Sequence, residues 1–108
     1  MTANEYQKYA QRTMNTDLTD HELLIDGVMG LCGESGECID LIKKVEFQGH
    51  HLNMEKLAEE LGDVAWYLAI TAAAIGYDLD DILQMNVDKL RKRYPEGFDT
   101  DKSINRKE

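Results

Sequence analysis

The sequence predicts an all-α protein, a four-helix bundle that assembles as a homo-oligomer. Three observations indicate the helical class. Apolar residues recur at helical spacing in four stretches, no stretch alternates apolar and polar residues, and the only proline, Pro95, follows the last of these stretches. The 108 residues are enough for one domain with a modest core. We expect that domain to span residues 1–99, followed by a polar tail at residues 100–108.

Aromatic and small residues at helical spacing predict a first helix over about residues 4–14. An Asn-Thr-Asp run ends it. Thr19 or Asp20 can cap the second helix, which we expect over residues 21–47. The main apolar stripe of this second helix, expected to face the core, consists of Leu24, Val28, Leu31, Ile39 and Ile42.

The third and fourth helices have clear end signals. Asn53 can cap a helix over residues 54–75, and Gly76 supplies the left-handed residue that commonly ends one. Asp78 can cap the fourth helix, expected over residues 79–94.

The second half of the third helix is apolar nearly all round, and a helix without a polar face is buried on all sides. A chain this short can hardly surround one of its own helices. We therefore expect self-association, as a homodimer or homotetramer, with Trp66 and Ile70 facing a second subunit.

The formal charge of −9 is unevenly distributed. Residues 1–88 hold 17 acidic and 5 basic residues, whereas residues 89–108 hold 4 acidic and 7 basic ones. The acidic body argues against partners such as nucleic acid or an anionic membrane surface. The chain also opens without the features of a signal peptide, and its longest apolar run is too short to span a bilayer, so we expect a cytoplasmic protein.

Two pairs of carboxylates lie within stretches whose pattern otherwise predicts buried amphipathic helices. Glu34 and Glu37 are three residues apart in the second helix, and Glu60 and Asp63 are three apart in the third, so each pair lies on one face. Acidic groups directed toward a core are costly to desolvate unless a positive charge neutralises them. A divalent cation held by oxygens, which commonly handles phosphates, would provide that charge.

At about 100° per residue, both pairs flank the apolar stripe on the same angular side of their helices. If the two helices pack antiparallel, the pairs can converge and hold one or two Mg²⁺ or Mn²⁺ ions. The alternative is a solvated acidic face with ordinary ion pairs.

The predicted site has no soft ligands of the kind that favour zinc or iron. His50 and His51 fall in a turn that we expect at the surface. Cys32 and Cys38 point in different directions, and we expect them to be buried, reduced thiols.

Glycines recur every third residue within the second helix, at Gly27, Gly30, Gly33 and Gly36. Each should cost about 1 kcal/mol against alanine in a helix interior. No strand precedes them, which excludes a phosphate-binding loop. Close approach of another helix, or room for a ligand beside the acids, explains them better.

The combined motifs resemble the MazG-like all-α nucleoside triphosphate pyrophosphohydrolases. That family carries ExxE, a gap, and ExxD. Here Glu34-Ser-Gly-Glu37 is followed by 22 residues and then by Glu60-Leu-Gly-Asp63, and the likeness extends over about residues 20–98.

The resemblance implies that Glu34, Glu37, Glu60 and Asp63 are catalytic residues that bind Mg²⁺. It also implies that a basic pair on the fourth helix binds triphosphate oxygens. The residues that match the family's substrate contacts are Lys89 and Arg93, with Asn86 and Lys56 as weaker candidates. From composition alone, the basic cluster would instead be a favourable set of cations at a helix C-terminus. The implied reaction is attack of water on the α-phosphorus of a nucleoside triphosphate, which releases the monophosphate and pyrophosphate.

Several alternatives stay open. The chain could be a phosphoribosyl-ATP pyrophosphohydrolase or a dUTP- or dCTP-specific relative, and outside the enzyme class it could be an acidic helical dimer that binds another protein. Tyr67 lies on the flank of the acids and could stack on a base, although a core position is more common. Tyr6, Gln7 and Phe98 could reach the pocket only if the termini fold over it.

Overall fold

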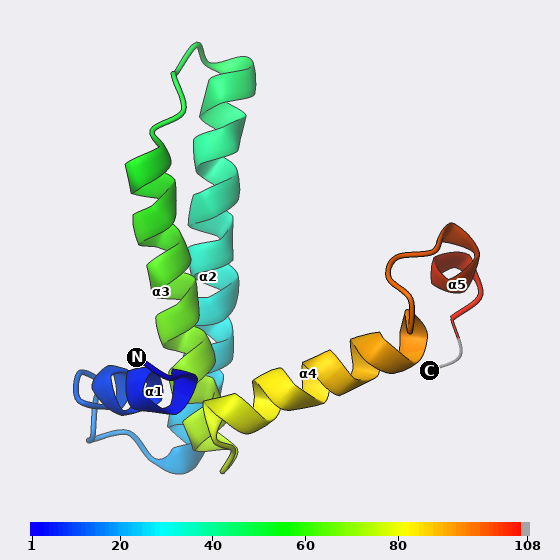
Figure 1. Ribbon diagram of the computed structural model, residues 1–108. Coiled ribbons are helices and arrows are strands. Elements are labelled where there is room, and N and C mark those ends of the chain that lie inside the picture. Colours follow the sequence, from blue (N-terminus) through cyan, green and yellow to red (C-terminus); the bar gives the residue numbers. More distant parts are fainter. Residues whose placement is uncertain (107–108) are drawn as a thin grey trace.

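The computed structural model describes residues 1–106, which form five helices and no strand (Figure 1). The four predicted helices are confirmed, with ends shifted by a few residues. The fifth helix lies in the segment expected as a polar tail, and residues 107–108 of that tail lie outside the described part. The helices are α1 (Ala3–Gln11), α2 (Asp20–Phe47), α3 (Met54–Ala74), α4 (Leu79–Arg93) and α5 (Thr100–Ile104).

Local capping explains where most helices begin. The Thr19 side chain accepts the amide hydrogen of Glu22, whose carboxylate in turn accepts that of Thr19, which completes a capping box at the start of α2. Asn53 accepts the amide hydrogen of Lys56 at the start of α3. Gly76, at φ +78°, has the left-handed conformation expected after α3. The sequence therefore predicted these three ends correctly.

The helices form an open arrangement. The helices α2 and α3 pack as an antiparallel hairpin, α1 crosses the base of the hairpin, and α4 leaves that base as an arm (Figure 1). The radius of gyration is 16.9 Å, whereas a compact domain of this length has about 13 Å. Within one chain, the helices therefore do not close into the expected bundle.

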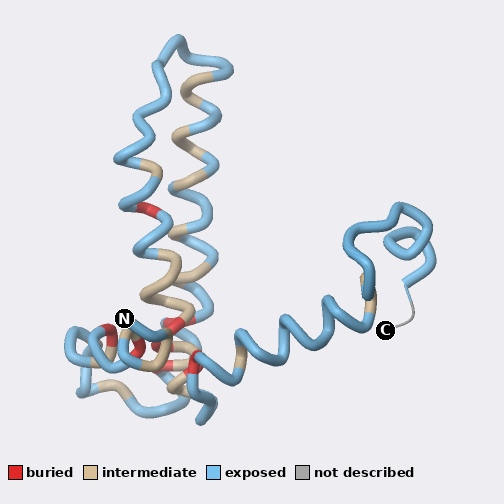
Figure 2. Tube along the Cα trace, in the orientation of Figure 1, coloured by how far each residue is buried: buried red, intermediate tan, exposed pale blue. Residues whose placement is uncertain are grey.

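The core lies where the four longer helices meet, at the base of the hairpin (Figure 2). Its buried members are Ala10, Leu23, Ala69, Ile70 and Leu79.

The expectation that Ile70 faces a second subunit is wrong, because Ile70 is fully enclosed within its own chain. Trp66 is half-buried, and its indole Nε1 donates a hydrogen bond to Thr13 Oγ1 at 2.8 Å. Ile70 is covered because it packs in one cluster with Ala10 of α1 and Leu23 of α2. Trp66 stays partly exposed, so its contact with a second subunit remains a prediction.

The face of α2 that meets α3 differs from the predicted one. The buried residues of α2 are Leu23 and Gly27, on the flank that carries the acids. Two members of the predicted core stripe, Val28 and Ile39, are 52% and 69% exposed. The helix has apolar residues on two adjacent faces, and its own chain covers only one of them.

Two glycines explain why that flank was selected. A β-carbon on Gly27 would overlap the side chain of Thr71, and one on Gly30 would overlap the ring of Tyr67. Gly33 and Gly36 have open space around them. The close-approach interpretation therefore holds for the first two glycines only.

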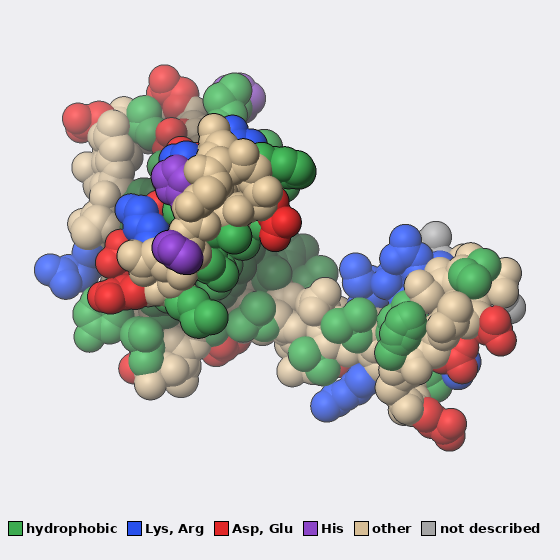
Figure 3. Space-filling model, turned by 90° about the horizontal axis from the view of Figure 1, so that it is seen from above, with side chains coloured by type: hydrophobic (Ala, Val, Ile, Leu, Met, Phe, Trp, Pro, Cys, Tyr) green, Lys and Arg blue, Asp and Glu red, His purple; other side chains and the backbone are tan. Residues whose placement is uncertain are grey.

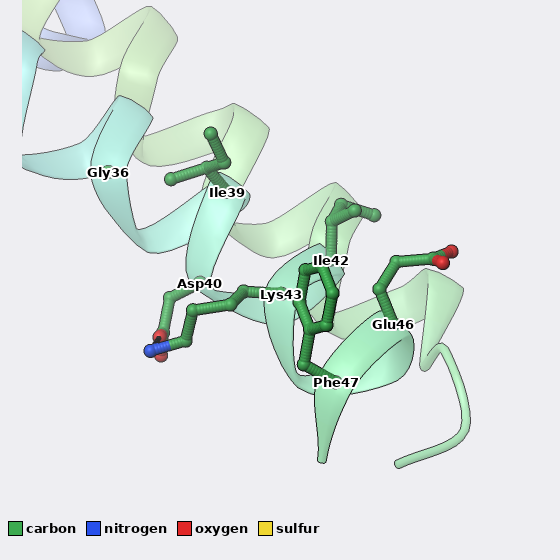
Figure 4. A pocket seen from close by; sticks show the side chains of 7 residues that line it. All are labelled: Gly36, Ile39, Asp40, Ile42, Lys43, Glu46 and Phe47. Carbon is green, nitrogen blue, oxygen red and sulfur yellow. Dashed lines mark ion pairs between the residues drawn. The ribbon is translucent and has the colours of Figure 1, made fainter. Parts of the chain in front are cut away.

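Apolar side chains remain exposed along α2. Ile39, Ile42 and Phe47 border a shallow groove of about 460 Å³ on the last turns of the helix, where Lys43 reaches toward Asp40 (Figure 4). We call the exposed residues Val28, Met29, Ile39, Ile42 and Phe47 the outer face of α2.

The thiols do not follow expectation, since Cys32 is exposed and Cys38 is half-buried. The residues lie on the exposed side and at the edge of α2, away from the core. The two turn histidines, His50 and His51, are exposed as expected. None of the helices described is both long and apolar enough to cross a membrane.

Candidate metal and substrate site

Three of the four predicted carboxylates converge halfway along the hairpin. Glu34 comes from α2, and Glu60 and Asp63 come from the facing side of α3. Each offers one oxygen, and the three oxygens lie within 4.8 Å of one another. The antiparallel packing of the two helices creates this cluster, because it sets the middle of α2 against the first half of α3.

Glu60 is the most enclosed member of the cluster. It is 9% exposed and is the only buried residue on α3 before Ala69. Lys56, one turn earlier on α3, places Nζ 3.4 Å from Glu60 Oε1. This ion pair supplies one positive charge within the cluster.

The crowding of acids changes the protonation of Glu34. Partial loss of hydration raises the pKa of Glu34, as does a hydrogen bond with Glu60. The negative charges of Asp63, Glu60 and Glu37 raise this pKa further. The direction of this shift means that a proton, or a cation in its place, relieves the repulsion among the acids.

The donor set fits a hard divalent cation. Its ligands are carboxylate oxygens, which Mg²⁺ and Mn²⁺ prefer, and Asp63 is exposed, which leaves the cluster open to solvent and to substrate. Glu34, Glu60 and Asp63 are the residues that could hold the ion.

Glu37 does not join the three converging oxygens. It lies almost one turn beyond Glu34 and is exposed. Its charge still reaches the site, since it contributes to the raised pKa of Glu34.

Three of the four predicted substrate-binding residues lie away from the acids, whereas Lys56 lies beside Glu60. Asn86, Lys89 and Arg93 are on α4, which packs mainly against α1 and the end of α3 before it projects away from the hairpin (Figure 1). Basic side chains lie along this arm in the view from above (Figure 3). The guanidinium carbon of Arg93 is 5.9 Å from the centre of the Tyr94 ring. A single chain therefore does not bring these residues to the acids.

Aromatic residues border the acids on one side. The terminal helix α1 does fold across the hairpin, and it places Tyr6 near the site: burial, and then the charge of Asp63, raise the pKa of the Tyr6 hydroxyl. Tyr67 is half-buried in the α2–α3 contact and meets Trp66 edge to face, with ring centres 4.9 Å apart. Phe98 instead packs against Tyr94 near the end of the arm.

The fold and the site together define an all-helical protein with an acidic, cation-type cluster between two antiparallel helices. The chain belongs to the MazG nucleotide pyrophosphohydrolase domain family, whose model matches residues 21–98. This match includes both acidic motifs and the whole of α4, and it confirms the family that the motifs indicated.

One relative is the Gene 37 protein of Mycobacterium phage L5. It is 37% identical to this chain over 73 residues, which cover 64% of each of the two proteins. The chain therefore spans less than two thirds of that relative, whose name states no activity. No solved structure matches the chain.

Proposed function

We propose that this protein is a Mg²⁺-dependent pyrophosphohydrolase that converts a nucleoside triphosphate or deoxynucleoside triphosphate and water into the monophosphate and pyrophosphate. The observation that carries the proposal is the convergence of Glu34, Glu60 and Asp63 within 4.8 Å in a member of this family. Mn²⁺ should be able to replace Mg²⁺, because the ligands are all oxygens.

In this proposal Glu34, Glu60 and Asp63 hold the cation, with Glu37 at the rim. When bound, the cation supplies positive charge against the phosphate oxygens and activates water for attack at phosphorus. Lys56, now paired with Glu60, would turn from that carboxylate toward a substrate phosphate. The family pattern assigns the remaining triphosphate contacts to Lys89 and Arg93, with Asn86 on the same face of α4.

We further propose that the site is completed in a homodimer or homotetramer. The outer face of α2 is an exposed apolar surface, and Leu83 and Leu90 are 45% and 41% exposed on the arm. Packing the arm of one copy onto the hairpin of another would cover both surfaces. It would also bring a basic helix end to an acidic hairpin, since the last turn of α4 carries Arg91, Lys92 and Arg93.

The decisive experiment is a nucleotide panel with Mg²⁺ or Mn²⁺ in which pyrophosphate and orthophosphate are measured separately. The panel includes the four ribonucleotides, the deoxynucleotides with dUTP and dCTP, and phosphoribosyl-ATP. We expect pyrophosphate release that stops in EDTA and in Glu60→Gln. Orthophosphate as the first product, or turnover unaffected by Glu60→Gln, would refute the proposal.

The exposed outer face of α2 also favours a second candidate, an acidic helical dimer that binds a partner protein. That candidate predicts no specific response to Mg²⁺. A Mg²⁺-dependent rise in melting temperature that is absent from Glu60→Gln would exclude it as a full account.

A further inference from the structure

The start of α4 is capped by α1 and not by its own N-cap residue. Asp78 occupies the N-cap position but makes no side-chain cap hydrogen bond. The amide of Leu79 instead donates to Gln7 Oε1 at 3.0 Å, and the amide of Asp80 donates to Asn4 Oδ1 at 2.9 Å. The first two amides of the arm are therefore satisfied by side chains more than 70 positions away.

Gln7 uses its side chain for three hydrogen bonds. It is only 5% exposed, and its Nε2 donates to the carbonyl oxygens of Ala69 and Tyr77, at 3.2 and 3.0 Å. One amide group thus joins α1, the last turns of α3 and the first amide of α4. A buried amide with three partners of fixed direction strongly restricts how these elements can be arranged.

The two acceptor side chains, Asn4 and Gln7, also fix the direction of the α4 axis. Asn4 and Gln7 are three residues apart and share one face of α1. The free amides of a helix's first turn point along its axis, so two neighbouring amides held by two points on α1 orient the axis of α4. A small change of angle at this joint would displace the far end of the arm by a large distance. Arg93 lies there, 14 residues after Leu79 at about 1.5 Å per residue.

We propose that Asn4 and Gln7 are positioning residues that set the direction in which α4 leaves the core, and thereby place Lys89 and Arg93. The part of this proposal that concerns the triphosphate rests on the proposed function. The part that concerns the direction of α4 rests only on the four hydrogen bonds at the joint.

The test compares three variants whose capping chemistry differs. Asn4→Ala removes the acceptor for Asp80, Asn4→Asp keeps an acceptor at that place, and Asp78→Ala changes the N-cap residue itself. Asn4 is only half-buried, so its variants should fold. Loss of a cap typically costs about 1 kcal/mol, so we expect Asn4→Ala to speed hydrogen exchange of the Asp80 amide about fivefold. Asn4→Asp and Asp78→Ala should stay near the wild-type rate.

Gln7→Glu tests the buried amide without changing its shape. An ionised glutamate can still accept from Leu79 but cannot donate to Ala69 or Tyr77. Residual dipolar couplings of the α3 and α4 amides measure the angle between the two helices directly. We expect this angle to change in Asn4→Ala and Gln7→Glu, and to return to the wild-type value in Asn4→Asp.

Kinetics then separates positioning from general stability. If the arm is misdirected, KM for the triphosphate should rise several-fold in Asn4→Ala while kcat and the affinity for Mg²⁺ alone stay near wild type, and Asn4→Asp should restore KM. An unchanged helix angle in both Asn4→Ala and Gln7→Glu, or faster exchange in Asp78→Ala alone, would overturn the proposal. An altered angle with unchanged KM would overturn its link to Lys89 and Arg93. If the wild type hydrolyses no nucleotide, the proposed function fails, and the dipolar couplings still decide whether α1 directs the arm.

Discussion

Gly30 of α2 lies directly against the ring of Tyr67 on α3, so closely that a β-carbon at Gly30 would overlap the ring. The same helix carries Glu34 one turn later, and α3 carries Glu60 and Asp63 within two turns before Tyr67. The closeness of the backbones at Gly30 therefore helps to bring the three carboxylates within reach of one cation.

Gly30→Ala should destabilise the protein, although alanine favours helices. The methyl group must displace a half-buried aromatic ring, and overpacking of this kind costs about 1–3 kcal/mol. Gly33→Ala is the matched control, because the space beside Gly33 is open and the helix should gain up to about 1 kcal/mol. Urea unfolding of the two variants measures both effects. Equal stability changes would mean that the helices are not in close contact at Gly30.

Glu34→Gln should stabilise the metal-free protein at neutral pH. The pKa of Glu34 is raised in the folded state above its ordinary value of 4.5, so the folded protein binds more protons than the unfolded chain between these two values. This contribution is complete below pH 4.5 and is lost as the pH rises through the raised pKa. A glutamine side chain does not titrate, so it loses no stability as the pH rises, and its amide can still donate a hydrogen bond to Glu60.

The measurement is the melting temperature of wild type and Glu34→Gln in EDTA from pH 4 to pH 8. The two melting temperatures should be similar at pH 4, and that of Glu34→Gln should become increasingly higher than that of the wild type toward pH 7. With Mg²⁺ the order should reverse, because only the carboxylate is a good ligand. Glu37 lies outside the three-oxygen cluster, so Glu37→Gln should change the melting temperature less than Glu34→Gln does. Equal changes in the two variants would argue against the assigned geometry.

Lys56→Ala should strengthen the binding of Mg²⁺ in the absence of nucleotide. The ammonium group at 3.4 Å from Glu60 competes with a cation for the same carboxylate. Lys56 is half exposed, and exposed pairs contribute about 0.2–1 kcal/mol, so the gain in affinity should be about 1.4- to fivefold. Isothermal titration calorimetry with Mg²⁺ alone measures it. Weaker binding in Lys56→Ala would show that Lys56 organises the site instead of competing for it.

Mixing two inactive variants should restore activity if the arm acts on another subunit. Glu60→Gln damages the acidic hairpin and Arg93→Ala damages the arm, and each should lose at least about tenfold in activity. In an equal mixture of exchanging two-fold dimers, half of the dimers are mixed, and each mixed dimer has one intact site. Activity should return to about a quarter of the wild-type value. No recovery in subunits shown to exchange would place both residues in the same chain's site.

The parts of the fold that were predictable from the sequence depend on local interactions. Thr19 with Glu22, and Asn53 with the amide of Lys56, form caps within a single turn, so residue type and spacing suffice to find them. The acidic cluster was also predictable, because the i, i+3 spacing places each pair on one face and a short turn makes the helices antiparallel. Only Glu37 stayed outside the group of three.

The remaining features depend on fit between distant segments. Apolar content alone predicted that the stripe with Val28 and Ile39 would face the core, whereas Gly27 and Gly30 allow the acidic flank of α2 to approach α3 more closely. Residue type likewise suggested that the Asp78 side chain caps α4. Asp78 does occupy the N-cap position, but the side chains of Asn4 and Gln7 on α1 accept the first two amide hydrogens. The open direction of α4 follows from these contacts, which no local pattern encodes.

The ion pair between Lys56 and Glu60 has a consequence for how this protein is supplied with metal. The most enclosed acid of the cluster already has a positive neighbour from its own helix, and the raised pKa of Glu34 makes a proton easier to keep there, so the hairpin can form before any cation arrives. Folding and metal loading are then separate events, unlike in domains that stay unfolded without their ion. In the proposed enzyme, the level of free divalent cations would then set the fraction of active protein, while its effect on folding would be limited to the stabilisation that any bound ligand gives.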